Sequence, residues 1–346
     1  MYTKHLISKN TTVRQALQKL DELRQDAILF VTDNGKLIGS ITDGDLRRGF
    51  IKGLGFEDEI LSFVQPNPEF IYENEFDQNK LETLRKKNYK LLPILNRDHI
   101  IVDILNFRLK TTLLPVDAVL MAGGKGSRLR PLTNNTPKPL LKVGEKPIIE
   151  YNIDRLAKVG VNTVYLSINY LGEQLESYFG DGTEKNISIK YIRETKPLGT
   201  IGSVMLVDDF QNEEIIVMNS DLLTNIDFAD FYKAFKEADA DMAVASVSYH
   251  VDIPYAVLET DETQKVQSLK EKPRYTYFSN AGIYLLKTKI LEMIPKDEFF
   301  DITTLMDKVI EMDRKLITYP INGYWLDIGR MEDYKKAQED IKHIQL

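Results

Sequence analysis

The feature that most constrains the fold is an alternation of apolar runs and helical stretches that begins after Pro115. The run at 116–122 is apolar except for Asp117, the run at 161–169 is mainly apolar, and between them residues 147–159 repeat apolar side chains at helical spacing. Apolar strands that alternate with helices predict a Rossmann-like α/β domain with a mainly parallel sheet covered on both faces. Further strands are expected at 187–193 and 213–221, helices at 173–179, from Thr200 and at 331–343, and a hairpin at 255–273 laid over one end.

The first 112 residues carry a weak internal repeat, in which one half matches the other after a shift of 63 positions. The segments at 26–49 and 90–110 both read as strand, turn and strand, and each follows a helical stretch, at 13–23 and 79–87. Neither half is long enough to bury a core alone, so we expect the two to pack as a pair. The predicted domains are therefore 1–112, a small α/β domain, and 115–346.

Composition excludes several classes of protein. The 346 residues are 43% hydrophobic and 28% charged, which is typical of globular domains, and the net charge of −7 argues against a nucleic-acid surface. There is no cysteine and there are four histidines, so thiolate and histidine-built metal centres are disfavoured. No signal-peptide core and no run of about 18 apolar residues occur, so we expect no membrane contact and a cytoplasmic location.

The segment "AVLMAGGKGSRLRPLTNNTPKPLL" at 118–141 carries the strongest chemical signal. Its three glycines let backbone N–H groups approach phosphate oxygens, Arg128 offers a planar fork and Lys138 a point charge. The segment is neither a P-loop nor a dinucleotide fingerprint, because Gly126 and Leu129 stand where those motifs need other residues. The alternative interpretation is a glycine turn with solvated bases.

This segment resembles the signature of the sugar-1-phosphate nucleotidylyltransferases, also called nucleoside-diphosphate-sugar pyrophosphorylases. The resemblance runs from roughly Pro115 to the C-terminus, and five further motifs follow in the family's order. They are "ETKPLGTIGSV" (194–204), "VMNSDLL" (217–223), "LKEKPR" (269–274), "NAGIYLL" (280–286) and "YWLDIGR" (324–330). Taken alone, each motif also fits a helix cap or a solvated turn. The order in which the five motifs follow the glycine segment is what indicates this class of enzyme.

The resemblance implies an enzyme that binds an NTP, a sugar 1-phosphate and Mg²⁺. Asp221 and Asp327 would hold the metal, and Arg128, Lys138 and Lys272 would be the catalytic cations. The implied NTP-binding residues are Ala122, Gly123, Gly124, Gly126, Ser127, Arg128, Lys138, Gly199 and Thr200. The implied sugar-phosphate-binding residues are Glu194, Glu271, Lys272, Asn280 and Gly282.

The chemistry expected of such an enzyme follows from charge. The phosphate of a sugar 1-phosphate attacks the α-phosphorus of the NTP and displaces pyrophosphate, so two polyanions must be screened and aligned. Mg²⁺ suits this task because it binds few carboxylates together with phosphates. No general base is needed, since a sugar phosphate is already ionised near neutral pH.

The sequence does not specify base or sugar. Bacterial relatives that carry the same N-terminal domain resemble guanylyltransferases acting on glucosamine 1-phosphate for nonulosonic (legionaminic-type) acid synthesis, which favours GTP. The alternatives are a uridylyl- or thymidylyltransferase or a mannose-1-phosphate guanylyltransferase, or a non-catalytic protein that senses nucleotides. Only 19 residues follow Asp327, so we expect no repeat-built acyltransferase domain.

The N-terminal repeat resembles a tandem CBS (cystathionine-β-synthase) domain, or Bateman module, through "GSITDGDL" at 39–46. The resemblance implies that Asp45 holds ribose hydroxyls of an adenine or guanine nucleotide and that Thr42 lies near its phosphate. Leu105 and Arg108 replace these residues in the second half. Asp45 also fits a helix cap. The resemblance further implies regulation by the nucleotide and a homodimer or larger homo-oligomer.

Overall fold

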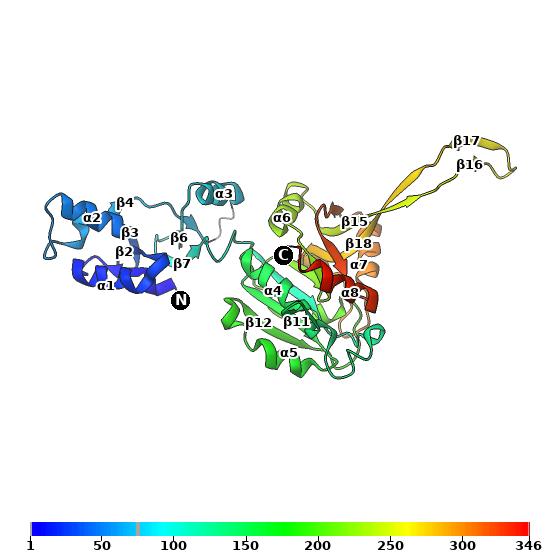
Figure 1. The fold of residues 1–346 in the computed structure, drawn as a ribbon, viewed down its shortest axis with the longest axis horizontal. Helices are drawn as coiled ribbons and strands as arrows, with labels where there is room; N and C mark the ends of the chain where they lie inside the picture. The colour runs from blue at the N-terminus through cyan, green and yellow to red at the C-terminus, as the bar shows by residue number, and fades with distance from the viewer. Residues whose placement is uncertain (1, 74–76, 345) are drawn as a thin grey trace. The chain divides into compact units, whose positions relative to one another are not determined.

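A computed structural model of the chain describes residues 2–73, 77–344 and 346, which form two compact units, 1–113 and 114–346. Figure 1 shows the elements of each unit. Within the described residues, no helix has both the length and the apolar character needed to cross a membrane.

Unit 1 contains two small sheets of the same design. In each, a short strand pairs in parallel with a longer one, which pairs antiparallel with the next. The first sheet has the order β1 (Leu6–Ser8), β2 (Ile28–Asp33), β3 (Lys36–Thr42) and β4 (Gln65–Pro66), and the second β5 (Ile71–Tyr72), β6 (Leu91–Leu95) and β7 (Ile101–Asn106). The helices are α1 (Val13–Leu23), α2 (Asp43–Ile51) and α3 (Gln78–Lys86).

The internal repeat is therefore structural, because β2 and β6, β3 and β7, and α1 and α3 correspond after the shift of 63 positions to within about two residues. Phe30 of the first half packs with Leu91, Leu95 and Ile101 of the second in one buried cluster. The halves also differ: the first sheet has a fourth strand, β4, and no helix corresponding to α2 follows β7 in the described chain.

Unit 2 is built on a seven-stranded sheet with the order β12-β11-β8-β13-β18-β15-β19. Its pairs are parallel except those that β18 makes with β13 and β15, so the predicted mainly parallel α/β sheet is confirmed. The strands are β8 (Val116–Met121), β11 (Thr163–Ile168), β12 (Ser188–Arg193), β13 (Glu214–Asn219), β15 (Met242–Asp252), β18 (Arg274–Lys287) and β19 (Leu316–Pro320). The helices are α4 (Ile148–Lys158), α5 (Gly172–Phe179), α6 (Phe228–Glu237), α7 (Ile302–Glu311) and α8 (Met331–Asp340).

The core of unit 2 follows from its apolar strands. β8, β11 and β13 are buried along nearly their whole length, as strands covered on both faces must be. On one face Val119 and Val217 pack with Leu305 and Val309 of α7. This burial fixes where the strands end, and therefore where the loops that follow them meet.

Two elements differ from the sequence prediction. The helix expected from Thr200 is a short 3-10 turn at Gly202–Leu206, because the Thr200 hydroxyl accepts from Ile302 N at 2.8 Å and is committed to the start of α7. The expected hairpin forms, as β16 (Val257–Thr260) and β17 (Val266–Lys270), but it is not laid over the domain. This hairpin forms the far end of a two-stranded ribbon, made of β15 and β18, that extends away from the rest of unit 2 (Figure 1). We call residues 247–279 the arm.

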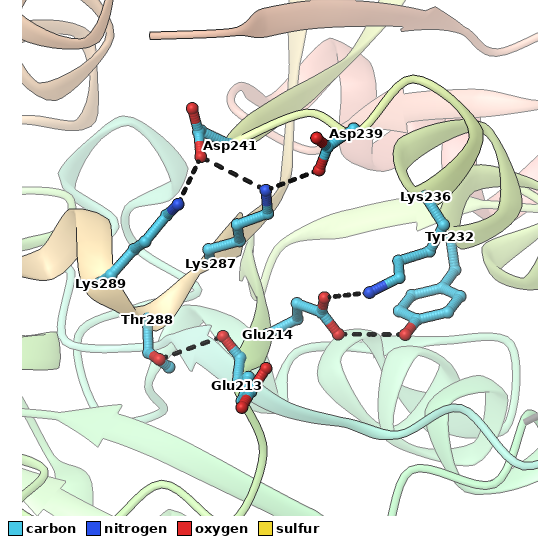
Figure 2. Close-up of polar contacts among 9 residues, drawn as sticks. All are labelled: Glu213, Glu214, Tyr232, Lys236, Asp239, Asp241, Lys287, Thr288 and Lys289. Atoms are coloured by element: carbon cyan, nitrogen blue, oxygen red, sulfur yellow. Dashed lines mark hydrogen bonds and ion pairs between the residues drawn. The ribbon is translucent and has the colours of Figure 1, made fainter. Parts of the chain in front are cut away.

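A charged cluster closes the edge of the sheet where β13 begins (Figure 2). Glu214, the first residue of β13, accepts from Tyr232 Oη at 3.0 Å and from Lys236 Nζ at 2.6 Å. Asp241 pairs with Lys287 at 3.4 Å and with Lys289 at 3.0 Å. Cations and anions of this cluster neutralise one another, which indicates a structural role.

Candidate active site

The carboxyl ends of β8, β11 and β13 meet at one edge of the sheet, where open α/β folds bind their ligands. Ser220, just after β13, donates its hydroxyl to the carbonyl of Met121 at 2.7 Å. Ala122 N donates to the carbonyl of Ser167 at 2.8 Å. These bonds hold the glycine loop and the segment before Asp221 together.

The backbone of the glycine loop is shaped so that a ligand can approach it closely. Gly126 has φ of +59°, and a Cβ on it would lie 2.9 Å from the Cβ of Lys138, so only glycine fits without strain. Thr133 donates its hydroxyl to the Gly126 carbonyl at 2.8 Å and fixes the turn. A Cβ on Gly124 would meet no atom of the described part of the chain within 4 Å, so this part of the backbone faces open space. Ser127 and Arg128 follow in a short 3-10 helix and are exposed.

Lys138 and Asp221 form an ion pair across 83 residues of chain, with Nζ donating to Oδ2. Their side chains are only 11% and 20% exposed. The other carboxylate oxygen of Asp221, Oδ1, is buried and has no hydrogen-bond partner in the described structure. A buried oxygen of this kind is costly unless it binds something.

Asp327 stands beside Asp221. It ends β20 (Trp325–Asp327), which pairs antiparallel with β14 (Leu222–Thr224), and Ile328 N donates to the carbonyl of Asp221 at 3.1 Å. Burial raises the pKa of Asp327, and the charge of Asp221 raises that pKa further, against the opposing charges of Lys138 and Arg128. Asp327 Oδ1 is also buried, and no described residue forms a hydrogen bond with it.

These two carboxylates fit a magnesium site that is completed by substrate. Both offer an unpartnered buried oxygen, and oxygen ligands are what Mg²⁺ prefers. The described residues contain no group of three or more His, Cys, Asp and Glu side chains able to hold a metal. A pair of carboxylates matches an ion that takes its remaining ligands from water and phosphates.

Arg128 lies beside the carboxylate pair. A Cβ on Gly329, two residues after Asp327, would lie 3.6 Å from Arg128 Nη2, an ordinary van der Waals distance, so the guanidinium lies close to the backbone of this residue. The side chain is exposed to solvent. Arg128 and Lys138 thus place two positive charges next to two negative ones, at the mouth of the glycine loop.

Glu194 also reaches this edge. Its Oε1 lies 2.5 Å from Ser167 Oγ, its Oε2 accepts from Leu198 N at 3.3 Å, and a Cβ on Gly123 would lie 3.1 Å from Oε1. Ser167 was not predicted as a site residue, and neither was Ser203, whose hydroxyl lies 2.9 Å from it. The available signal was a polar residue inside the apolar run of β11.

Asn280 and Gly282 lie next to the end of β13. Gly282 has φ of +72°, and a Cβ on it would lie 2.6 Å from Asn219 Nδ2. The side-chain oxygen of Asn280 accepts from Gly282 N at 2.9 Å. Asn219, two residues before Asp221, is a further polar residue of this edge that sequence reasoning missed.

Gly199 and Thr200 contact Phe300 and Asp301, the two residues that precede α7. A Cβ on Gly199 would lie 2.5 Å from the carbonyl oxygen of Phe300. Thr200 donates through both N and Oγ1 to Asp301, each at 3.1 Å. They lie in the segment that follows Glu194, where their contacts attach it to the start of α7.

Glu271 and Lys272 are not brought to the carboxylate pair. Both are exposed in the turn between β17 and β18, on the arm. From Asn280 at its root to Arg274 the ribbon extends six residues, or about 20 Å at ordinary strand rise. The arm rises from the same edge of the sheet as the site, because β15 runs parallel to β13.

In unit 1, Thr42 and Asp45 form the N-terminal cap of α2. Asp45 is buried, and its Oδ2 accepts from Thr42 N at 2.8 Å and Thr42 Oγ1 at 2.6 Å, while Arg48 pairs with Oδ1. In the second half, Arg108 donates to Asp26 at 2.9 Å and Asn106 does so at 3.0 Å. The arginine at the position of Asp45 therefore ties the two halves together.

The fold and site define an α/β protein that presents a glycine loop, two cations and two carboxylates for phosphates at one sheet edge. Residues 117–344 match the family model described as nucleotidyl transferase, and residues 5–52 match the model described as CBS domain. The chain belongs to the nucleotidyl transferase family and carries a CBS domain in its first half-repeat.

Relatives within this family act on different substrates. The chain is 31% identical over 231 residues to a mannose-1-phosphate guanylyltransferase of Mycobacterium tuberculosis, covering 65% of this chain and 64% of that protein. It is 27% identical over 253 residues to a UTP–glucose-1-phosphate uridylyltransferase of Synechocystis, covering 66% and 65%. It thus spans less than two thirds of either relative. The crystal structure of HddC from Yersinia pseudotuberculosis matches with a TM-score of 0.50 and 29% identity, over 65% of this chain and 99% of HddC.

Proposed function

We propose that the chain is a Mg²⁺-dependent sugar-1-phosphate nucleotidylyltransferase, which converts an NTP and a sugar 1-phosphate into a nucleotide sugar and pyrophosphate. The observation that carries this proposal is the Lys138–Asp221 pair with Asp327 beside it, at the end of a glycine loop. Two buried carboxylate oxygens without partners and two cations fit a triphosphate with its metal.

The reaction is a displacement at phosphorus. An oxygen of the sugar phosphate forms a bond to the α-phosphorus of the NTP, the bond from that phosphorus to the bridging oxygen breaks, and pyrophosphate leaves with the electron pair. The bound metal would supply positive charge that offsets the charge on the phosphate oxygens. Catalysis of this kind rests on positioning and on charge stabilisation.

Each residue of the site has a defined part in this proposal. Backbone N–H groups of the glycine loop approach the phosphates where Gly124 leaves space, and Arg128 and Lys138 neutralise the triphosphate. Glu194 and Asn280 lie at the same edge and would accept hydrogen bonds from sugar hydroxyls.

For the substrates we propose GTP and glucosamine 1-phosphate. The likeness to a guanylyltransferase supports the base, and the likeness to a uridylyltransferase makes UTP the competing choice. The test is a screen of ATP, CTP, GTP and UTP, with dTTP, against glucosamine, glucose and mannose 1-phosphates, reading pyrophosphate release. The proposal expects release that needs both substrates and is fastest with GTP. NTP binding with no release for any pair would leave a nucleotide sensor.

We further propose that a ribonucleotide binds at Thr42 and Asp45 and regulates the enzyme. The carboxylate would exchange its present partners, Thr42 and Arg48, for the ribose hydroxyls. Calorimetry of the full chain with AMP, ATP, GMP and GTP should show a site that is lost in Asp45→Ala and weaker for 2′-deoxy analogues. Equal heats in both proteins would leave Asp45 as a helix cap only.

A further inference from the structure

The backbone on either side of Asp221 is held by a buried polar side chain. Ser220, the residue before it, donates its hydroxyl to the carbonyl of Met121 in β8 at 2.7 Å. Leu222, the residue after it, accepts at its carbonyl from Asn152 Nδ2 at 2.9 Å. This second bond comes from α4, 70 residues earlier in the chain. The peptide units that flank Asp221 are therefore attached to two different elements of the domain.

The carbonyl of Leu222 needs the bond from α4 because the strand ladder does not supply one. Leu222 lies opposite Asp327 in the pairing of β14 with β20. The adjacent pair is the hydrogen-bonded one, since Ile328 N donates to the carbonyl of Asp221. Bonded and non-bonded pairs alternate along an antiparallel ladder, so the Leu222 carbonyl points away from β20. Leu222 is 1% exposed, and a buried carbonyl without a partner is costly, so the Asn152 amide fills a need that the fold creates.

Asn152 is a polar residue on a face of α4 that packs into the core. It is 1% exposed, and the neighbouring buried side chains of the helix include Ile149, Ile153 and Leu156. Burying an amide is unfavourable unless it is hydrogen-bonded, whereas an apolar side chain would pack here as its neighbours do. The choice of asparagine is therefore explained by the carbonyl that its amide holds.

We propose that Asn152 is a positioning residue of the metal site, which acts through Leu222 to fix the backbone that carries the Asp221 carboxylate. This inference rests on the proposed function. Asp221 and Asp327 carry like charges side by side, which favours their separation until a cation binds. β14 and β20 are three residues long each and form only a two-stranded sheet, which is a weak constraint by itself. The bond from α4 adds the constraint that keeps both carboxylates in place for one ion.

The same helix provides a matched control. Arg155, one turn after Asn152, donates from Nη2 to the carbonyl of Ile226. Ile226 is also buried, but it lies beyond β14 and is five residues away from Asp221. Loss of either donor leaves a buried carbonyl without that bond, so both Asn152→Leu and Arg155→Met should be less stable than wild type. Only the loss of Asn152 should alter the carboxylate pair.

The single tryptophan of the chain gives a readout that does not depend on activity. Trp325 lies in β20, two residues before Asp327, so its excitation should sensitise the emission of Tb³⁺ bound at the carboxylate pair. Tb³⁺ is a hard cation that, like Mg²⁺, prefers oxygen ligands. The full chain would be titrated with Tb³⁺ alone, with light that tryptophan absorbs and tyrosine does not, and Mg²⁺ would then be added as a competitor.

The apparent Kd for Tb³⁺ should rise about tenfold in Asn152→Leu, because residues that support a metal ligand contribute about 10–100-fold in affinity. Asn152→Ala, which cannot clash with its neighbours, should show the same rise, and Arg155→Met should stay within about twofold of wild type. Each titration is made well below the unfolding temperature of the variant. Asp327→Asn should abolish the emission that Mg²⁺ competes away.

The outcomes separate this inference from the proposed function. If Asp327→Asn abolishes the emission but both Asn152 variants bind Tb³⁺ within about twofold of wild type, the positioning role is overturned and the metal site stands. Equal weakening in Arg155→Met and Asn152→Leu would also overturn that role, because it would reflect a general loosening of the domain. Emission that neither Mg²⁺ nor Asp327→Asn reduces would overturn the metal site of the proposed function, and this inference with it.

Discussion

Asp221 and Asp327 lie side by side at the carboxyl edge of the sheet, joined by a hydrogen bond from Ile328 N to the carbonyl of Asp221 at 3.1 Å. They are separated by more than 100 residues, and each keeps a buried Oδ1 that has no hydrogen-bond partner among the residues the structure describes. Lys138 pairs with one of them and compensates part of their repulsion. This arrangement is unfavourable by itself and becomes favourable when a cation and phosphates enter.

The positive charges of Lys138 and Arg128 should contribute to the reaction of the NTP. We expect Lys138→Met and Arg128→Ala each to lower kcat/KM for the NTP by about 10²–10³, because a donor aimed at transition-state charge contributes roughly 2.7–4 kcal/mol. Steady-state kinetics with varied NTP measure this. Lys125→Ala, an exposed neighbour in the loop, is the control and should stay within a few-fold. Equal losses in all three variants would count against specific roles.

The glycine loop gives a matched pair of substitutions. Gly126→Ala should lower the free energy of unfolding by about 1–2 kcal/mol, because its left-handed φ and the Lys138 Cβ both exclude a side chain. Gly124→Ala should leave unfolding unchanged, since its Cβ meets nothing, but should weaken NTP binding if phosphate occupies that space. Thermal unfolding and titration with NTP separate the two effects. Normal binding by Gly124→Ala would contradict a close phosphate contact.

Lys272→Ala should raise KM for the sugar 1-phosphate about tenfold and leave KM for the NTP within twofold, because it removes a charge-assisted contact to one substrate. Lys272 lies on the arm, so this effect requires the turn at 271–273 to approach the site when sugar binds. Lys265→Ala, in the turn at the arm's tip, is the control. Unchanged KM values would remove Lys272 from the sugar side.

The Asp26–Arg108 pair predicts a pH dependence of stability. Hydrogen bonding to Arg108 lowers the pKa of Asp26 below its ordinary value, with further lowering by the Arg108 charge and by Asn106 against an opposing effect of burial. The stabilisation is therefore complete above the pKa of an unfolded aspartate, about 3.9, and is lost as pH falls through the lower folded pKa. Wild type should exceed Asp26→Asn by about 1 kcal/mol at pH 7, in chemical denaturation, with the difference shrinking below pH 4. A constant difference would contradict the pairing.

Apolar periodicity predicted most of the fold. Strands such as β8 and β11 and helices such as α4 and α8 were predicted to within about three residues, because burial on both faces leaves long apolar runs in the sequence. The absence of a helix after Thr200 could not be predicted from the sequence, because it results from a hydrogen bond to α7, about 100 residues away. The arm was expected to lie over the domain, but the ladder of β15 and β18 continues beyond the sheet to the Asp252–Arg274 pair, which local patterns do not show.

Sequence motifs identified the candidate residues, and the pairing of strands determines which of these residues lie close together in the structure. Asp221 and Asp327 come together through β14 and β20, a pair of three-residue strands too short to recognise in sequence. Ser167 and Asn219 were missed for a similar reason, because their contacts, Glu194 after β12 and Gly282 in β18, come from strands that neighbour their own in the sheet. Thr42 and Asp45 cap α2, which was the alternative interpretation of their sequence, and their binding of a nucleotide stays a prediction.

Pyrophosphate release by Asp221→Asn and Asp327→Asn, measured with Mg²⁺, NTP and sugar 1-phosphate, tests the paired-carboxylate site most directly. Both should fall at least a hundredfold below wild type, and EDTA should abolish wild-type release until Mg²⁺ is restored. Glu214→Gln, at the opposite end of β13 from Asp221, is the control and should keep its activity well below its unfolding temperature. Release within a few-fold of wild type in either Asn variant would contradict the paired-carboxylate site.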